Sequence, residues 1–500
     1  MKKYFKYSLI FFSFYSLNCI YSLNINEPLV GPIVKITDSN KIRISAFDLG
    51  QKNKKKYMIS RIRESNNKSQ WSKLYMKEVR INKNYGEFIE FNNLSPGKRY
   101  DYQLGFLENP LMKKSGEEIY LTDDKVWDNL PIYNTRTYDD KSSEYTFAFG
   151  SCRHFLQLLG VHFNDLQESD ESFKSINKLI RNGQRIDSLY MLGDQIYTDT
   201  VKYLPWLRHT KFKSIKKLYE GAKNTTGLKK LSSLIETLEI PDDHEYRDNG
   251  STIKSEEDSF AYNNAVDNIN IYEHPFGPYI RGQGKVMDYG MVFDRSPASI
   301  FLCDSRFSRV NKPLQIMNKS QMNKLTKWIL NPKQSFSILA TPISFALQKY
   351  EDTWFGFNKS TQDVLKALEN SKMKKLFVLT GDSHSSCSSE FNLSRLDKSG
   401  NWHNTKKNVV EIMSSSFYQH FHDDKNNFHD KRMINNIYKL ESVESLKSIR
   451  DKVIEDNNFA VVNVNSNSSS KKDKEHKKEL EVTYYKDSGE KISSYKYSAD

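Results

Sequence analysis

From Tyr145 onward, short apolar segments alternate with stretches of helical spacing, and this rhythm constrains the fold more than any other feature. Five apolar segments have the length of buried strands: TFAFGS (146–151), SLYMLGD (188–194), ASIFLCD (298–304), FSILAT (336–341) and LFVLTGD (376–382). Helical spacing follows in ESFKSINKLIRNG, SIKKLYEGAK, LKKLSSLIETLEI and KSQMNKLTKWIL. Continuous apolar strands bounded by helices are typical of sheets covered by helices. Residues 141–500 are therefore expected to form one layered α/β or α+β domain, which includes the C-terminal strands.

The preceding part of the chain has a different pattern. From about Gly31 to Thr137, apolar and polar residues alternate with period two, and turn-forming clusters such as Ser95-Pro96-Gly97 interrupt them. Alternation with regular turns predicts an antiparallel β-sandwich, here over 25–140. The segment LSPGKRYDY resembles the turn into a late strand of fibronectin type III-like modules. We expect this domain to act as a structural spacer.

Four polar clusters stand where strands of the second domain end. They read GSCRH (150–154), GDQIYTD (193–199), PDDHEYRDN (241–249) and GDSH (381–384). One Gly-Asp alone is often only a turn, and Asp-Asp-His-Glu alone could begin a helix, whose dipole favours acids. Four such clusters at strand ends, where α/β domains place their ligands, predict a centre of two or three metal ions. Carboxylates can bridge cations, while thiolate and phenolate favour a trivalent or softer ion.

In this order the clusters resemble the PhoD-like alkaline phosphatase/phosphodiesterase family of the calcineurin-like metallophosphoesterases. The shared elements are Ser-Cys after the first strand, Gly-Asp-x-x-Tyr, Asp-Asp-His-Glu, Asp-x-Arg-x-x-Arg (304–309) and Gly-Asp-x-His. Gln321 and Trp328 match the helix that follows in the family. The resemblance extends from about residue 30 over most of the chain. It implies an α+β fold, in which an N-terminal fibronectin III-like β-sandwich precedes a four-layer α/β/β/α metallophosphoesterase sandwich.

The resemblance also assigns roles to single residues. It implies that Cys152, Asp194, Tyr197 and Asp382 bind Fe3+ and that Asp194 bridges to Ca2+, although other divalent metals remain open. Further implied metal ligands are Asn249, His384 and Asp243, with Asp248 as the alternative to Asn249. His244 takes the place of the catalytic histidine. Arg153 or Arg306 would bind a phosphate oxygen, while an internal salt bridge to Asp304 is the alternative for Arg306.

Two departures from the family pattern bear on the substrate. Family members commonly have Gln after Ser-Cys, where this chain has Arg153-His154, and a Trp often precedes Asp-Asp-His-Glu, where it has Pro241. The expected activity is hydrolysis of phosphodiesters, phosphomonoesters or both. Attack on phosphorus would come from a hydroxide that forms near neutral pH, because a cation lowers the pKa of its bound water. The alternatives are a phospholipase or nuclease type of phosphodiesterase and, much less favoured, a non-catalytic surface binding protein.

The N-terminus predicts export. A basic start is followed by the apolar run YSLIFFSFYSLNCI (7–20), which has the dimensions of a signal peptide over 1–22. Cleavage would release the protein to the periplasm, the cell surface or the medium, and membrane anchoring is the alternative. Four cysteines in 500 residues are too few for a disulfide framework. We therefore expect Cys152 to be protected by metal, Cys303 to be a core thiol and Cys387 to lie near the metals.

The charge balance adds one weaker expectation. The chain carries 75 Lys and Arg against 62 Asp and Glu, a net charge of +13. Such an excess suits contact with polyanions or a membrane surface, although a Lys- and Asn-rich composition can also reflect genomic bias. No obligate protein partner is implied. A polar loop is the expected state of His420, His422 and His429, with a metal site as the alternative.

Overall fold

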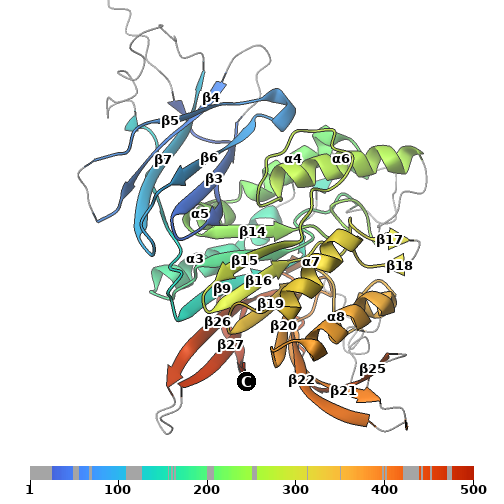
Figure 1. Cartoon of the computed structure of the whole chain (residues 1–500). Coiled ribbons are helices and arrows are strands. Elements are labelled where there is room, and N and C mark those ends of the chain that lie inside the picture. The colour runs from blue at the N-terminus through green and yellow to red at the C-terminus, as the bar shows by residue number, and fades with distance from the viewer. Residues whose placement is uncertain are drawn as a thin grey trace, which may run out of the picture.

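The computed structural model describes most of the chain after its N-terminus (Figure 1). The described residues are 25–48, 56–66, 70–108, 127–155, 157–158, 161–162, 165–199, 208–249, 256–311, 314–348, 351–396, 399, 402–419, 438–440, 443–450, 453–469 and 476–499. The predicted signal peptide (1–22) and His420, His422 and His429 lie outside them. Within the described residues, no helix is long and apolar enough to cross a membrane.

The first eight strands form two antiparallel sheets, in agreement with the alternating pattern. They are β1 (Ile25–Asn26), β2 (Val30–Thr37), β3 (Lys41–Phe47), β4 (Lys56–Glu64), β5 (Tyr75–Glu78), β6 (Gly86–Asn92), β7 (Arg99–Glu108) and β8 (Tyr133–Arg136), with the short helix η1 (Ile81–Lys83) before β6. One sheet has the order β1-β7-β4-β5, with β8 beside β7, and the other has the order β2-β3-β6. Ile44, Phe91, Met58 and Leu104 belong to the apolar core that the two sheets share.

Two larger sheets build the rest of the molecule. The first has the order β14 (Glu236–Ile240), β13 (Ser188–Leu192), β9 (Glu144–Gly150), β26 (Asn458–Ser469), β27 (His476–Lys486), β28 (Lys491–Ser498). The second has the order β15 (Met291–Arg295), β16 (Ala298–Leu302), β19 (Phe336–Ala340), β20 (Lys375–Thr380), β22 (Trp402–Met413), β21 (Cys387–Leu396), β25 (Val443–Arg450), β24 (Tyr438–Leu440). Strands β9, β13 and β14 run parallel, as do β16, β19, β20 and β22.

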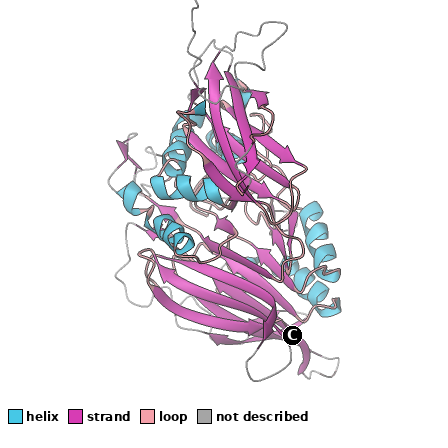
Figure 2. Ribbon diagram, turned by 90° about the vertical axis from the view of Figure 1, so that its left-hand side faces the viewer, coloured by secondary structure: helices cyan, strands magenta, loops and turns pink. Residues whose placement is uncertain are grey.

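Apolar contacts stack these sheets and their helices into layers (Figures 1 and 2). Phe149, Leu192 and Ile300 belong to a core between the two sheets. Helices α3 (Glu171–Arg181) and α5 (Thr226–Leu234) cover the first sheet, and α7 (Lys319–Leu330) and α8 (Asn358–Asn370) cover the second. The sequence predicts this arrangement, in which antiparallel sheets at the N-terminus precede a mixed α/β architecture.

The remaining elements are short or lie beside these layers. Helices α4 (Phe212–Lys223) and α6 (Glu256–Tyr272) share a core with the start of β2. The other elements are β10 (Arg153–His154), β11 (Gln157–Leu158), β12 (Val161–His162), α2 (Asp165–Glu168), β17 (Val310–Asn311), β18 (Leu314–Gln315), η4 (Trp354–Phe357) and β23 (Tyr418–Gln419).

One helical expectation is wrong in its length. The stretch LKKLSSLIETLEI has helical spacing throughout, yet α5 ends at Leu234 and Ile235 is extended, with φ −123° and ψ 158°. Residues 236–240 form β14, which is fully buried and pairs with β13 in parallel. Sheet pairing outside the local sequence decides this boundary, because the β-branched residues of the segment suit a buried strand as well as their spacing suits a helix.

Buried polar contacts join the N-terminal sheets to β14 of the first larger sheet. Lys35 of β2 is buried, and its Nζ lies 2.8 Å from Oε2 of Glu239 on β14. The backbone N–H of Thr37 donates to Oε1 of Glu236 at 2.9 Å. Separation of β2 from β14 would leave Lys35 and Glu239 without their partners, and an unpaired buried charge is costly. These contacts therefore hold the N-terminal sheets against β14.

Candidate metal centre

Four loops meet at one end of the two large sheets. They follow β9, β13 and β14 of the first sheet and β20 of the second. The N–H of Cys152 donates to the carbonyl of Gly193 at 3.2 Å, and the N–H of Asp382 donates to Oγ of Ser151 at 3.1 Å. The parallel strands thus bring together polar clusters that are far apart in the sequence, since Ser151 and Asp382 are separated by 231 residues.

Glycines allow the loops to approach this closely. A Cβ at Gly193, whose φ is +94°, would lie 2.4 Å from Cβ of Asp242. A Cβ at Gly381 would lie 2.3 Å from Oγ of Ser151. Since any side chain would collide at these two points, the Gly of each Gly-Asp motif is required by packing between neighbouring loops.

Five of the predicted site residues have left-handed backbone conformations. Their φ angles are 56° at Cys152, 54° at Asp194, 52° at Asn249, 66° at Asp382 and 51° at His384. Non-glycine residues rarely adopt positive φ, and they keep it where the surrounding structure imposes it. The strain concentrates in the loops that carry the four motifs, which is typical of a functional site.

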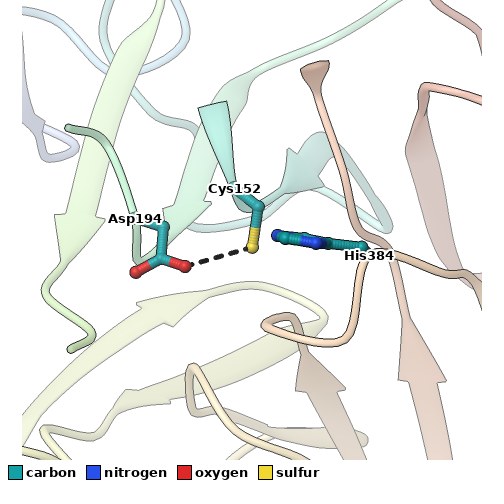
Figure 3. Close-up of side chains that lie close together, drawn as sticks. All are labelled: Cys152, Asp194 and His384. Atoms are coloured by element: carbon teal, nitrogen blue, oxygen red, sulfur yellow. Dashed lines mark hydrogen bonds between the residues drawn. The ribbon is translucent and has the colours of Figure 1, made fainter. Parts of the chain in front are cut away.

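Acidic, thiol and imidazole groups gather at this point (Figure 3). Three sets have ligand atoms within 4.8 Å of one another: Cys152, Asp194 and His384; Asp194, Asp243 and His244; and Asp194, Asp242, Asp243 and Asp382. Sγ of Cys152 lies 3.4 Å from Oδ2 of Asp194. Asp194 belongs to all three sets, so its carboxylate occupies the position expected of a bridging ligand.

Tyr197 reaches the same point from the turn after Asp194. Its buried hydroxyl lies 3.2 Å from Oδ2 of Asp194 and 3.2 Å from Nε2 of His384. Burial, with the charge of Asp194, raises the pKa of this phenol well above its usual range. Burial likewise raises the pKa of the Cys152 thiol, so neither group ionises near neutral pH unless a cation is beside it.

The donor set fits metal ions. Burial, together with the neighbouring carboxylate of Asp243, raises the pKa of Asp194 to about 6, although His244 opposes this, and raises that of Asp382 to about 7. Oδ2 of Asp242 and Oδ1 of Asp243 are buried and accept no hydrogen bond. Buried carboxylate oxygens without donors are costly, and cations satisfy several of them at once.

His244 is held by a carboxylate that the sequence did not single out. Its Nδ1 lies 2.7 Å from Oδ1 of Asp199, while Oδ2 of Asp199 accepts the N–H of Asp248 at 2.6 Å. Burial lowers the pKa of His244, but Asp243, Asp194 and Asp199 outweigh burial and raise it well above its usual range. Asp199 therefore fixes the imidazole with Nε2 as its remaining nitrogen.

Arg306 lies beneath the carboxylates and is fully buried. Its Nε donates to Oδ1 of Asp242 at 2.5 Å, its Nη1 donates to Asp352, and its Nη2 lies 3.8 Å from Oδ1 of Asp243. The internal salt bridge weighed for Arg306 thus exists with these partners. Asp304 instead accepts the backbone N–H of Arg306 at 2.9 Å. Arg306 balances the acidic cluster and is not placed to bind substrate from solvent.

Arg153 does not reach the site, which corrects its predicted role in phosphate binding. Its guanidinium is buried among α-helical segments and donates to the carbonyl of Ser169 at 3.0 Å, the carbonyl of Ala222 at 2.6 Å and Oγ1 of Thr225 at 3.0 Å. Its donors are thus used by Ser169, Ala222 and Thr225 and not by the acidic cluster. A side chain of a β-strand projects to one face of the sheet, and that of Arg153 projects toward these helices.

Asn249 stands at the edge of the site with an exposed side chain. Its backbone N–H donates to Oδ2 of Asp243, and its side-chain amide donates to Oδ1 of Asp248 at 3.2 Å. The carboxylate of Asp248, the alternative candidate, lies 4.0 Å from Nε2 of His244. The structure therefore brings Cys152, Asp194, Tyr197, Asp243, His244, Asp382 and His384 together, and the side-chain amide of Asn249 contacts Asp248 beside them.

Sequence reasoning missed three acidic residues of the site. Asp242 completes the carboxylate set, Asp199 orients His244, and Glu245 accepts the N–H groups of Gln195 at 2.6 Å and Asp242 at 2.9 Å. All three lie inside the quoted motifs, so their presence was visible. Their side-chain directions depend on loops that only the fold brings together.

Comparisons with known proteins bear on the fold and on the part of the site that follows residue 292. A family model described as PhoD-like phosphatase matches residues 292–468, which include the Asp-x-Arg and Gly-Asp-x-His motifs. A solved structure described as "Structure of PhoD" superposes with a TM-score of 0.63 at 15% identity, covering 94% of this chain and 92% of that chain. The predicted PhoD-like resemblance is confirmed, and the family match implies phosphoesterase activity.

A second solved structure is too dissimilar to support a conclusion about this fold. A glycosyl hydrolase family 2 member from Bacteroides cellulosilyticus aligns with a TM-score of only 0.27 at 11% identity, over 95% of this chain and 64% of that chain. A search of curated protein sequences finds no match to this chain.

Proposed function

We propose that this PhoD-like chain is an exported metal-dependent phosphoesterase that hydrolyses phosphodiesters, phosphomonoesters or both. The observation that carries the proposal is the convergence of Asp194, Asp242, Asp243 and Asp382 within 4.8 Å, with a thiol and two imidazoles in the adjoining sets. A phosphoester brings concentrated negative charge, which a purely acidic pocket repels. The site becomes complementary to that charge only when cations occupy it.

The residues divide into two groups by the ions they would hold. Cys152, Tyr197, Asp194 and Asp382 offer sulfur, phenol and carboxylate donors, a set that suits Fe3+. Asp243 and the bridging Asp194 offer oxygens, which suit Ca2+ or another divalent ion. When bound, such ions lower the pKa of a water and neutralise charge on the phosphoryl oxygens.

The protein's own groups perform the remaining work. Asp199 holds Nδ1 of His244, so Nε2 can carry a proton to the oxygen of the leaving alcohol or donate to a phosphoryl oxygen. Arg306 keeps the carboxylates of Asp242 and Asp243 in place from below. We also propose that the two larger sheets and their helices form the family's four-layer α/β/β/α metallophosphoesterase sandwich. The N-terminal antiparallel sheets would then be the fibronectin III-like domain that precedes it.

Paired substitutions test the function. Asp194→Asn and Cys152→Ser should lose bound metal and hydrolysis of bis(p-nitrophenyl) phosphate and p-nitrophenyl phosphate. Cys303→Ser is the matched control, because Cys303 is also a buried thiol and is part of the core of the second large sheet. Elemental analysis and initial rates should fall together in the two site variants alone. Activity that persists in both site variants would contradict the proposal.

Metal identity and substrate need separate measurements. Ferric ion bound by thiolate and phenolate would colour the protein by ligand-to-metal charge transfer, and a colourless, fully active preparation would exclude that assignment. A panel of phosphomonoesters, phosphodiesters, phospholipids and nucleic acids would separate the phospholipase and nuclease alternatives. Export rests on residues 1–22 and is tested by N-terminal sequencing of the secreted protein.

A further inference from the structure

Arg153 and His154 occupy the place where the sequence departs from its family, and the structure separates their roles. Both residues form β10, which pairs in parallel with β23, Arg153 opposite Tyr418 and His154 opposite Gln419. Successive side chains of a strand point to opposite faces. Because the guanidinium of Arg153 is fixed beside α4 and α5, the imidazole of His154 is directed to the other face, toward the metal centre.

The imidazole of His154 there meets the ring of Tyr197. The two ring centroids lie 4.4 Å apart with an interplanar angle of 37°. The ring of His244 lies 4.2 Å from the same tyrosine at 30°. Both imidazoles thus pack against the phenol ring of Tyr197.

The position of this ring matters to the metal centre. The hydroxyl of Tyr197 lies 3.2 Å from both Oδ2 of Asp194 and Nε2 of His384. A rotation of the phenol about its Cα–Cβ bond would move the hydroxyl away from both atoms. The two imidazole rings that pack against the phenol oppose that rotation.

We propose that His154 is a positioning residue that, together with His244, holds Tyr197 in the orientation needed to bind metal. His154 itself then contacts neither the metal nor the substrate. The inference rests on the proposed function, because it assigns Tyr197 as a ligand. It explains why an aromatic ring two residues after Cys152 belongs to the site, while the intervening Arg153 belongs to the scaffold.

The test compares two substitutions of His154 in the full-length protein. His154→Phe keeps a flat ring and removes both ring nitrogens, whereas His154→Ala removes the ring. His403 is exposed on β22, and His403→Ala serves as the control for a histidine outside the site. The metal-free protein is titrated with Zn2+ by calorimetry, and thermal unfolding of the metal-free variants checks that each is folded.

Aromatic ring pairs are worth about 0.5–1.5 kcal/mol, which corresponds to a change of about 2- to 13-fold in a dissociation constant. We expect His154→Ala to weaken Zn2+ binding by that factor, and His154→Phe and His403→Ala to bind like the wild type. The KM for bis(p-nitrophenyl) phosphate should stay unchanged in His154→Ala, because the imidazole does not touch substrate.

Other results would overturn the inference. Equal weakening in His154→Phe and His154→Ala would mean that the ring nitrogens matter, and unchanged binding in His154→Ala would mean that the ring is not needed. Wild-type protein that binds Zn2+ but hydrolyses no phosphoester with any metal would refute only the proposed function. Wild-type protein that binds no metal would refute both.

Discussion

Removing the carboxylate of Asp199 should cost activity without costing metal. Asp199 accepts from Nδ1 of His244 at 2.7 Å, and His244 lowers the pKa of Asp199 although burial opposes this, so the bond joins charged partners. Hydrogen bonds to charged groups contribute about 1.5–3 kcal/mol, and each 1.36 kcal/mol is tenfold in rate, so Asp199→Ala should lower kcat by about 10- to 150-fold. Asp199 belongs to none of the metal-ligand sets, so metal content should not change.

The assay is a double-substitution cycle with a chromogenic phosphodiester. Asp199→Ala, His244→Ala and the double variant are compared for kcat, KM and metal content. If Asp199 acts through His244, the double variant is no slower than His244→Ala alone. Asp199→Asn keeps one acceptor oxygen, which can face Nδ1 of His244 while the acceptor for the N–H of Asp248 is lost, so it should lose less than Asp199→Ala. Losses that multiply in the double variant, or an Asp199→Ala enzyme of normal rate, would refute this reasoning.

Three further outcomes are expected. Arg153→Met should lower the free energy of unfolding by about 2–4 kcal/mol in chemical denaturation, because it strands the buried acceptors that Arg153 now satisfies; an unchanged unfolding midpoint would contradict this. Burial, with the charge of Glu239, raises the pKa of Glu273 to about 8, so the folded state binds the proton more tightly than the unfolded state. Stability should therefore fall as pH rises from the ordinary glutamate range through about 8, and Glu273→Gln should flatten that slope in unfolding measured against pH. Removal of metal by a chelator should abolish hydrolysis and lower the melting temperature in calorimetry, since four crowded carboxylates then repel one another, and re-addition of metal should restore both.

Much of the fold was predictable because its signal is local. Period-two alternation marked the strands of the N-terminal sheets, and apolar runs marked β9, β13, β16, β19 and β20. The boundary between α5 and β14 was not predictable, because LKKLSSLIETLEI satisfies both patterns and only the pairing of β14 with β13 decides between them. The contact between Lys35 and Glu239, which joins the N-terminal sheets to β14, could not be predicted from the sequence either. A lysine in an alternating strand normally faces solvent.

The candidate site divides in the same way. The motifs named Cys152, Asp194, Asp243, Asp382 and their neighbours, because the residue types and their places after strands already carry the chemistry. They could not say which side chains would face inward. Arg153 and Arg306 looked alike as phosphate-binding cations, yet one anchors the scaffold and the other lies buried under the acids.

By itself, the sequence determined that strand ends rich in Asp, His, Cys and Tyr carry candidate metal ligands in a layered α/β fold. This was possible because the residue types and their places directly after apolar strands are local features of the sequence. The tertiary structure alone decided that Asp194 is shared by all three ligand sets, that Asp199 holds His244, and that Arg153 and His154 face opposite ways. Those facts are relations between side chains distant in sequence, and their geometry exists only once the sheets have packed.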